Sequence, residues 1–423
     1  MEANIDQAKK ETAGLLWRKN GNFYRPDYTR GLNTVMPTVM ELLGNPIPGF
    51  PTMTDHLPKA TPRKVKRVVL LCLDALGFKE FAAGSLFPRL YCDYGTWVSS
   101  VFPTITSCAL TSLAQGLPPS QHGLIGHEVW KHTPGAVVDL LKMQVVGATA
   151  SLSESGFDLN QWRKSPGVLE TDQSQRLPGT HLLPYRIQGS GLSLYTYNHG
   201  QRLGYVDFNE GLDKVARILN DIEHGWVSVY YEVIDSLSHV LGGGHPVVGI
   251  AVQQIEAVTQ WLAKALPSHI AEETLLMVVA DHGQNDIRQY LPIHGQPMNW
   301  LNQNTRAIGF SGRVMHLYLG DHPAAPVEEW LREFLGEAGQ VLAFNEIAEL
   351  AGDFTDPAFV RESLGDLVVV LHDGWNWEKR VRDPAASPYE SRLVSQHGAL
   401  SWEEMFVPLL AVPMSVLRSE PPA

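Results

Sequence analysis

Cysteine and positive charge are both scarce in this chain. The 423 residues include three cysteines, Cys72, Cys92 and Cys108, an odd number without the spacing of a thiolate metal site. Such sparse use of cysteine suits a reducing compartment. Asp and Glu number 45 against 33 Lys and Arg, a formal net charge of −12 that argues against a protein coating nucleic acid. The negative net charge does not exclude small phosphate substrates, because bound divalent cations reverse the local electric field.

Long apolar runs are missing as well. No stretch reaches the roughly 20 apolar residues that a membrane span requires. The C-terminal run 405–417 is shorter than that and contains Pro408 and Pro413. The first 30 residues are polar and mixed in charge, unlike a secretory signal. We therefore expect a soluble, cytoplasmic protein that does not bind membranes, and the sequence leaves its oligomeric state open.

What the chain does have is an alternation of apolar runs and helical periods. Hydrophobic residues make up 44% and charged residues 18%, as in globular proteins. The patterns predict strands at 64–73, 97–102, 226–233, 274–280, 313–319 and 367–371, and helices at 107–115, 213–224, 246–266 and 327–337. This alternation predicts an α/β fold with a mostly parallel sheet that helices cover on both faces.

Two segments depart from this alternation. Residues 1–64 are rich in turn formers, and we expect them to form an N-terminal surface segment ahead of a main domain at 65–423. From about 131 to 210 the periodicity weakens and Gly, Ser, Pro and Gln accumulate. We predict that this second segment is a cap inserted between core elements.

Carboxylates and hydroxyls follow four of the predicted strands. Asp74 follows the first, Thr106 the second, Asp235 the third, and the pair Asp281-His282 the fourth. Since parallel strands bring their carboxyl ends to one edge of the sheet, we expect these side chains to converge. Taken alone, an Asp-His-Gly turn is more often a loop with a satisfied histidine than a metal site.

A second histidine lies near the third of these positions. Asp235 and His239 are four residues apart, which suits one turn of helix or a tight loop. Asp and His are the ligands that zinc takes when thiolates are absent. The ordinary alternative is a helix N-cap at Asp235 with His239 on the surface.

Hydroxyl groups also stand directly before a predicted helix. Thr106 lies where the helix dipole and unpaired N–H groups attract phosphate. A threonine hydroxyl is a poor nucleophile unless its proton is removed or a metal coordinates the alkoxide. By chemistry alone Thr104 and Thr111 are rival nucleophiles, and helix capping by Thr106 or Ser107 is the structural alternative, compatible with catalysis.

Five short motifs follow one another in the chain. They are Phe102-Pro-Thr-Ile-Thr-Ser107, Gly116-Leu-Pro-Pro-Ser-Gln-His-Gly123, Asp235-x-x-x-His239, Asp281-His282-Gly283 and Gln396-His397-Gly398. In this order they resemble the alkaline phosphatase superfamily, most closely its type I phosphodiesterase/nucleotide pyrophosphatase branch. The resemblance covers roughly residues 65–300 and the region around His397. The tail from His397 to Pro408 also resembles the cofactor-independent phosphoglycerate mutases of the superfamily.

This resemblance implies a fold, a cofactor and a reaction. It implies an alkaline-phosphatase-like three-layer α/β/α sandwich, with a mostly parallel central sheet and an inserted cap, as the catalytic domain at 65–423. It implies two divalent metal ions, zinc with manganese as the alternative. Thr106 would act on a small phosphate ester and form a covalent phosphothreonine. One metal would be held by Asp235, His239 and His397, the other by Asp74, Thr106, Asp281 and His282.

The chain departs from the branch at two positions. His127 stands where the branch has an asparagine that helps to hold the phosphoryl oxygens. An imidazole there would donate a hydrogen bond, add charge when protonated, or serve only the structure. Ser107 follows the nucleophile, where the branch often has an aromatic residue that lines the leaving-group pocket. These differences affect substrate preference more than reaction type.

Several functions remain in competition. We expect a phosphodiesterase or nucleotide pyrophosphatase, with a phosphomonoesterase as the first alternative. A metal-bound binding protein without activity is the second alternative. A sulfatase is disfavoured because the chain lacks the Cys-x-Pro-x-Arg context around a modifiable residue. A phosphoglycerate mutase is disfavoured because threonine, not serine, stands at the nucleophile position.

Overall fold

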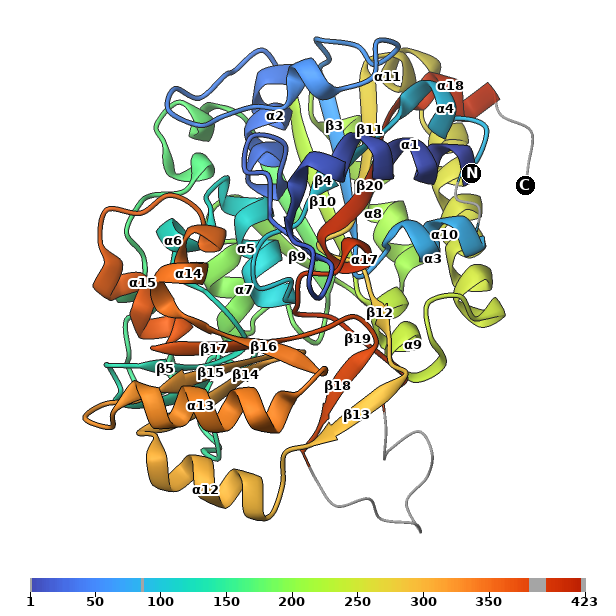
Figure 1. Ribbon diagram of the computed structural model, residues 1–423. Coiled ribbons are helices and arrows are strands. Elements are labelled where there is room, and N and C mark those ends of the chain that lie inside the picture. Colours follow the sequence, from blue (N-terminus) through green and yellow to red (C-terminus); the bar gives the residue numbers. More distant parts are fainter. Residues whose placement is uncertain (1, 85–86, 380–392, 420–423) are drawn as a thin grey trace.

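A seven-stranded sheet forms the centre of the molecule, for which we use a computed structural model that describes residues 2–84, 87–379 and 393–419 (Figure 1). The strand order is β4-β20-β11-β3-β10-β8-β9. All neighbouring pairs are parallel except the two that involve β20. The mostly parallel sheet is therefore confirmed. Its strands are β3 (Arg67–Leu73), β4 (Gly95–Ser99), β8 (Gly179–Pro184), β9 (Gln201–Tyr205), β10 (Gly225–Tyr231), β11 (Thr274–Val279) and β20 (Phe406–Pro413).

The central strands β3 and β11 are buried at every residue, as their continuous apolar runs predict for strands covered on both faces. Their register matters for function. Val279 pairs with Cys72, and Tyr231 pairs with Leu73. Strands β11, β3 and β10 thus end nearly level, which places the residues that follow them at one edge of the sheet.

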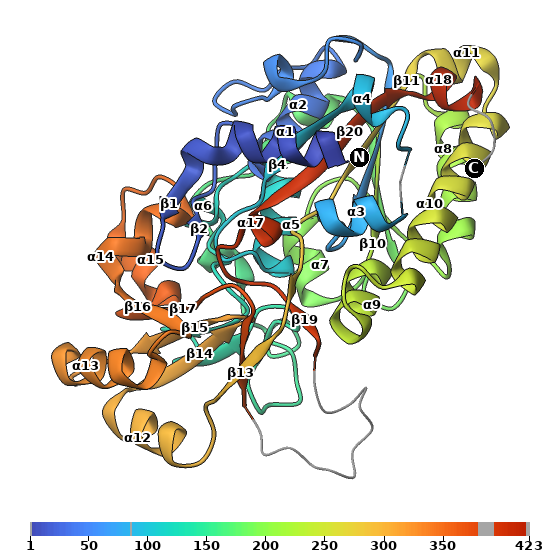
Figure 2. The same cartoon turned by 45° about the vertical axis from the view of Figure 1, so that its right-hand side comes forward.

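Helices cover both faces of this sheet (Figures 1 and 2). Helices α2 (Val35–Leu42), α5 (Thr106–Gln115) and α7 (Gly191–Thr196) lie on one side. Helices α3 (Phe78–Gly84), α8 (Phe208–Asp221), α9 (Val233–Leu241) and α10 (Pro246–Ala265) lie on the other. Helix α8 shows why such a segment forms a helix and packs on the sheet. Asp207 caps its N-terminus, and apolar residues recur at helical spacing on its buried side, namely Phe208, Leu212, Val215 and Leu219.

A second, smaller sheet lies beside the first. It has the order β14-β15-β17-β16 and is antiparallel throughout. Helix α13 (Ala324–Leu335) packs on it around a separate hydrophobic cluster that includes Met315 and Val369. The strands predicted near 313–319 and 367–371 therefore exist, but they belong to this sheet. Its strands are β14 (Ala307–Ser311), β15 (Val314–Tyr318), β16 (Gly339–Ala343) and β17 (Leu367–Leu371).

The predicted cap at 131–210 is wrong in its second half. Strands β5 (Glu128–Lys131), β6 (Ala136–Asp139) and β7 (Gln144–Val145) do form a separate three-stranded sheet. Strands β8 and β9, however, extend the central sheet at its edge. The edge position explains the weak pattern: β9 is exposed or half-buried at four of its five residues, so it lacks an apolar run.

The predicted N-terminal surface segment, 1–64, is also wrong in part. Helix α1 (Glu2–Thr12) lies on the surface, with two buried residues. Helix α2, in contrast, buries seven of its eight residues in the main hydrophobic core. The prediction failed there because turn formers around a short helix hid its apolar content. The C-terminal apolar run forms β20, and no helix within the described ranges is long and apolar enough to cross a membrane.

Candidate metal centre

Three of the predicted ligands form a buried group that we call the inner cluster: Asp74, Asp281 and His282. Asp74 directly follows β3, and Asp281 comes two residues after β11. Their ligand-type atoms lie within 4.8 Å of one another. His282 Nε2 is 3.3 Å from Asp281 Oδ2 and 3.6 Å from Asp74 Oδ1. All three are buried, so the level strand ends do converge as predicted.

Two carboxylate oxygens of the inner cluster are buried without a hydrogen-bond partner among the described residues, namely Asp74 Oδ1 and Asp281 Oδ2. The other oxygens are satisfied. The Tyr230 hydroxyl donates to Asp74 Oδ2, and the amides of Ala75 and His282 donate to Asp281 Oδ1 at 3.0 Å. Unpaired buried carboxylate oxygens are costly, and they face one imidazole nitrogen. This donor set fits a divalent cation.

Burial and neighbouring charge act together on Asp74. Burial, followed by the charges of Asp281 and Asp235, raises the pKa of Asp74 well above its ordinary value. The charged form is therefore disfavoured by the protein alone. A divalent cation between these carboxylates would remove that penalty.

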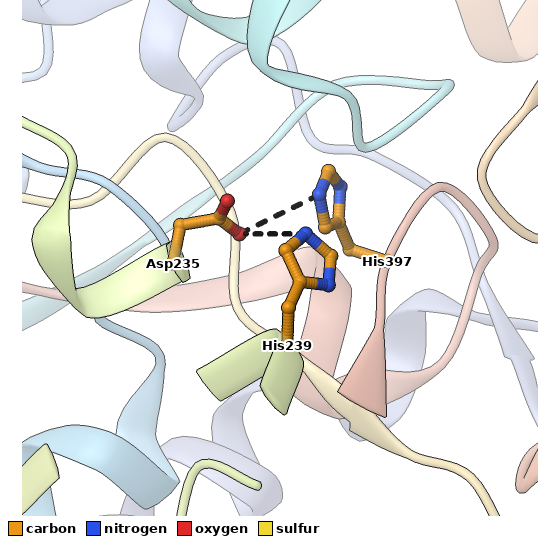
Figure 3. Close-up of side chains that lie close together, drawn as sticks. All are labelled: Asp235, His239 and His397. Carbon is orange, nitrogen blue, oxygen red and sulfur yellow. Dashed lines mark ion pairs between the residues drawn. The ribbon is translucent and has the colours of Figure 1, made fainter. Parts of the chain in front are cut away.

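Three of the remaining four predicted ligands form the outer cluster: Asp235, His239 and His397. Helix α9 carries Asp235 and His239 one turn apart. His397 follows β19 (Ser395–Gln396), which pairs with β12 (Asn285–Asp286) just after the inner cluster. Asp235 Oδ1 lies 3.3 Å from His239 Nε2 and 3.6 Å from His397 Nε2, and both rings turn toward it in Figure 3. The three ligand-type atoms lie within 4.8 Å.

Charge is better balanced in the outer cluster. Burial alone would raise the pKa of Asp235, but His239 and His397 hold that pKa below its ordinary value. Although burial opposes its charge, His239 has a raised pKa because of Asp235. Burial and the nearby His282 lower the pKa of His397 well below its ordinary value. A neutral imidazole of this kind has a lone pair for a metal.

All three histidines are held in the same orientation by backbone carbonyls. His239 Nδ1 lies 2.9 Å from the carbonyl oxygen of Ser395, and His397 Nδ1 lies 2.7 Å from that of Thr104. His282 Nδ1 lies 3.2 Å from the carbonyl oxygen of Gly283. A carbonyl oxygen only accepts, so Nδ1 carries the proton in each ring. Each Nε2 is thereby left to face its cluster, which is the orientation that metal-binding histidines require.

Thr106 joins the two clusters. It begins α5, and its Oγ1 lies 3.2 Å from His282 Nε2. The rings of His282 and His397 stack with centroids 3.7 Å apart, so the clusters are adjacent. No side-chain hydrogen bond caps α5, and Ser107 Oγ instead donates to Gly126 O at 2.8 Å. The capping alternative therefore does not hold for either residue.

The rival hydroxyls have structural partners. Thr104 Oγ1 donates to Ala399 O at 3.0 Å and accepts from Gly398 N at 2.9 Å. Thr111 Oγ1 lies 2.7 Å from Ser107 O inside α5. Both threonines are buried, whereas Thr106 faces two cavities. Among the three, Thr106 has the free approach that a nucleophile needs.

Two cavities of about 510 Å³ each meet at Thr106, and Leu141 and Asp235 line both of them. The first cavity also contains His127, His239 and His397. The second contains Asp74, Lys142 and Arg186. All eight predicted site residues therefore lie in or beside one centre, and His127 forms part of a cavity wall.

Sequence reasoning missed several polar residues that support this centre. Gln284 donates to Asp235 Oδ1 at 2.6 Å and accepts from Ser395 Oγ at 2.8 Å. Tyr230 donates to Asp74, and Asp139 lies 3.1 Å from His127. Gln284 directly follows Asp281-His282-Gly283, a position that suggested nothing by itself. Tyr230 and Asp139 carry no sequence signal, because strand pairing and a turn bring them to the centre.

Comparison with known proteins now adds to this geometry. Residues 68–400 match the model of the family described as type I phosphodiesterase / nucleotide pyrophosphatase. No curated protein sequence matches the chain. The murine and human ectonucleotide pyrophosphatase / phosphodiesterase 5 have a similar fold, each with a TM-score of 0.60 and 15% identity. The aligned region covers 83% of this chain and 93% or 92% of the murine or human chain.

A third solved structure with this fold is an inactive threonine-to-alanine variant of the murine protein in complex with AMP. Its TM-score is 0.58 at 14% identity, and the aligned region covers 84% of this chain and 93% of that chain. At such identities the likeness establishes the α/β fold with its mixed, mostly parallel sheet.

Proposed function

The chain belongs to the type I phosphodiesterase/nucleotide pyrophosphatase family, and from this premise we propose that it hydrolyses phosphate esters with two divalent metal ions and Thr106 as nucleophile. One observation carries the proposal. The Thr106 hydroxyl lies beside His282, which is buried together with two carboxylates, and each of these carboxylates has one oxygen without a hydrogen-bond donor among the described residues. A phosphodiester or pyrophosphate bond is the expected target at family level.

The residues divide into two metal sites in this proposal. Asp235, His239 and His397 would hold one ion, and Asp74, Asp281, His282 and Thr106 would hold the other. Imidazole and carboxylate donors without thiolates favour zinc, with manganese as the alternative. When bound, the ions supply positive charge that stabilises a deprotonated hydroxyl and the charge developing on phosphate.

The protein's own groups position the reaction. Thr106 Oγ1 gives up its proton to solvent and attacks phosphorus in line; the bond to the ester oxygen breaks, that oxygen leaves and takes a proton from solvent, and a phosphothreonine forms. The first turn of α5 directs N–H groups at the phosphoryl oxygens. A water molecule then attacks phosphorus, the bond to Thr106 Oγ1 breaks, and phosphate or a monoester departs. His127, in the cavity wall, binds a phosphoryl oxygen.

The murine relative with bound AMP supports this proposal by analogy, because its inactive form lacks a threonine. A phosphomonoesterase is the second candidate, and the observation that favours it is the imidazole at position 127. A binding protein without activity would not need the Thr106 hydroxyl to face two cavities between the inner and outer clusters. A small phosphate ester as partner, a cytoplasmic location and the absence of membrane binding stay predictions.

Replacing the nucleophile tests the proposal. Thr106→Ala should lower kcat against bis(4-nitrophenyl) phosphate by at least about 10³-fold, because no other hydroxyl occupies the position. Metal analysis should find at least one ion still bound per chain. Thr111→Ala, which removes a buried hydroxyl of the same helix, is the matched control and should cost far less. Undiminished turnover in Thr106→Ala would contradict the nucleophile assignment.

A further inference from the structure

One carboxylate outside the two clusters bonds to a side chain in each of the two cavities. Asp139, at the end of β6, has an almost buried side chain. Its Oδ1 lies 3.1 Å from His127 Nε2, and its Oδ2 lies 3.0 Å from Lys142 Nζ. His127 lines the first cavity and Lys142 lines the second, and both cavities include Thr106. We call these three residues the anion-binding unit.

Asp139 is held in its charged form. Burial by itself would raise the pKa of Asp139, but hydrogen bonds from His127 and Lys142 keep that pKa below its ordinary value. The amides of Leu141 and Lys142 also donate to Asp139 Oδ1 at 3.0 Å. A carboxylate with this many donors is a fixed negative charge, around which His127 and Lys142 are ordered.

The backbone of His127 is equally well fixed. Its amide donates to Ser311 Oγ at 2.8 Å, and its carbonyl accepts from Leu140 N at 2.7 Å. A carboxylate only accepts hydrogen bonds, so Nε2 of His127 carries a proton, and Nδ1 is the ring nitrogen left for a ligand. A phosphate oxygen also only accepts. A phosphate can therefore bind Nδ1 only when the ring is doubly protonated, with Asp139 as its counter-ion.

Lys142 adds a positive charge on the other side of Asp139. Its side chain is 69% exposed, and its cavity also contains Arg186. Leu141, the residue before Lys142, lines both cavities. Asp139 thus bonds to one side chain of each cavity that meets at Thr106.

The charge at the reaction centre gives these residues their role. Two divalent ions would be offset by Asp74, Asp235, Asp281 and the Thr106 alkoxide. A centre without net charge distinguishes a phosphate with one negative charge from a phosphate with two only through additional charges nearby. Lys142 and, when it is protonated, His127 supply positive charge there.

Resting on the proposed function, we propose that His127 and Lys142, ordered by Asp139, bind the second negative charge of a phosphate group presented to Thr106. The site then favours phosphate monoester dianions over diester monoanions, so within the proposed function the inference selects the phosphomonoesterase candidate. Asp139 is a positioning residue in this arrangement, and His127 and Lys142 contact the substrate.

The test compares two esters on the zinc-loaded enzyme. We measure kcat/KM for 4-nitrophenyl phosphate and for bis(4-nitrophenyl) phosphate in the wild type, Asp139→Asn and His127→Asn. Both variants should lower the ratio of monoester to diester kcat/KM by about 10-fold or more, as expected for loss of a hydrogen bond to a charged group. Asp139→Glu should recover part of the ratio. Glu128→Gln removes a carboxylate from the same cavity and should not lower the ratio.

Binding of inorganic phosphate gives a readout that is independent of turnover. In the zinc-loaded Thr106→Ala background, Asp139→Asn should weaken phosphate affinity about 10-fold by calorimetry, and weaken dimethyl phosphate affinity less. If Asp139→Asn does not fold, His127→Asn, which keeps the Asp139–Lys142 pair, gives the result. Unchanged ester ratio and phosphate affinity overturn the inference. A wild type that hydrolyses neither ester, with phosphate affinity still dependent on Asp139, overturns the proposed function and leaves the inference standing.

Discussion

The inner and outer clusters use similar ligands in different surroundings. The inner cluster sits at the ends of two buried strands, and its side chains have almost no exposed surface. The outer cluster depends on one helical turn and a distant loop, and the side chains of Asp235 and His239 are 18% and 19% exposed. The inner cluster has unpaired carboxylate oxygens, whereas in the outer cluster each charge faces an opposite one. Rigid strand ends can hold charges together that a helix and a loop would let separate.

The largest expected effect is a difference in kcat/KM between substitutions in the inner cluster and in the outer cluster. Asp281→Asn removes a fixed, buried ligand beside Thr106, and we expect kcat/KM to fall by about 10³-fold or more. His239→Ala opens a site that already faces a cavity, and we expect a smaller loss that added zinc partly restores. Metal analysis and kcat/KM at increasing zinc concentration would measure both. Equal losses with equal rescue would remove the distinction between the clusters.

A smaller effect concerns the stability of the metal-free protein at pH 7, where substitutions in the two clusters should change the free energy of unfolding in opposite directions. Asp74 has a raised pKa, so its charged form destabilises the fold, and Asp74→Asn should raise the free energy of unfolding. Asp235 has a lowered pKa, so its charge stabilises the fold at pH values above the pKa that Asp235 has in the unfolded chain. Asp235→Asn should therefore lower the free energy of unfolding. We expect changes on the order of 1–3 kcal/mol. Denaturant titration after chelation measures them, and changes of the same sign would contradict this account.

The smallest effect concerns Glu80, which belongs to neither cluster. Its buried carboxyl packs against Gly77, in the loop after β3, and against Gly243, in the loop after α9. Burial raises the pKa of Glu80 to about 8. The folded protein then binds a proton that the unfolded chain has released, so the free energy of unfolding should fall as pH rises from about 4.5 to about 8.

Glu80→Gln should flatten this slope and, at pH 8.5, stabilise the protein by about 1 kcal/mol or more. Unfolding free energies at four pH values across the window would show it. Glu272→Gln, a change at an exposed position on α11 (Ser268–Glu272), is the control and should keep the wild-type slope. A slope unchanged in Glu80→Gln would mean that Glu80 is ionised in the folded state.

Much of the central architecture was predictable from local patterns. The runs at β3, β10 and β11 are apolar enough to indicate buried parallel strands, and the polar residues after them indicate one edge. The predictions failed where the local signal was weak. Strands β8 and β9 at the sheet edge carry polar residues, and α2 is short. The second sheet was predicted as strands but not as a separate unit, because a period of two residues identifies a strand without identifying its neighbour.

The residues of the centre divide in the same way. Asp74, Asp235, His239, Asp281 and His282 were predictable from strand ends and a helical turn. Thr106 was a strand-end candidate with Thr104 and Thr111 as rivals, His397 depended on the family resemblance, and Gln284, Tyr230 and Asp139 were missed. The choice of Thr106 over Thr104 and Thr111 became clear only when the rivals were found bonded to the backbone.

The amino-acid sequence by itself determined the α/β class and the identities of the groups available for metal and phosphate chemistry. Both follow from interactions between residues near one another along the chain, namely strand runs, helix periods and strand-end positions. Only the tertiary structure decided that two clusters differ in burial and charge balance, and that Asp139 orders a histidine and a lysine around Thr106. Those properties depend on contacts between residues far apart in sequence, whose free energies no local pattern contains.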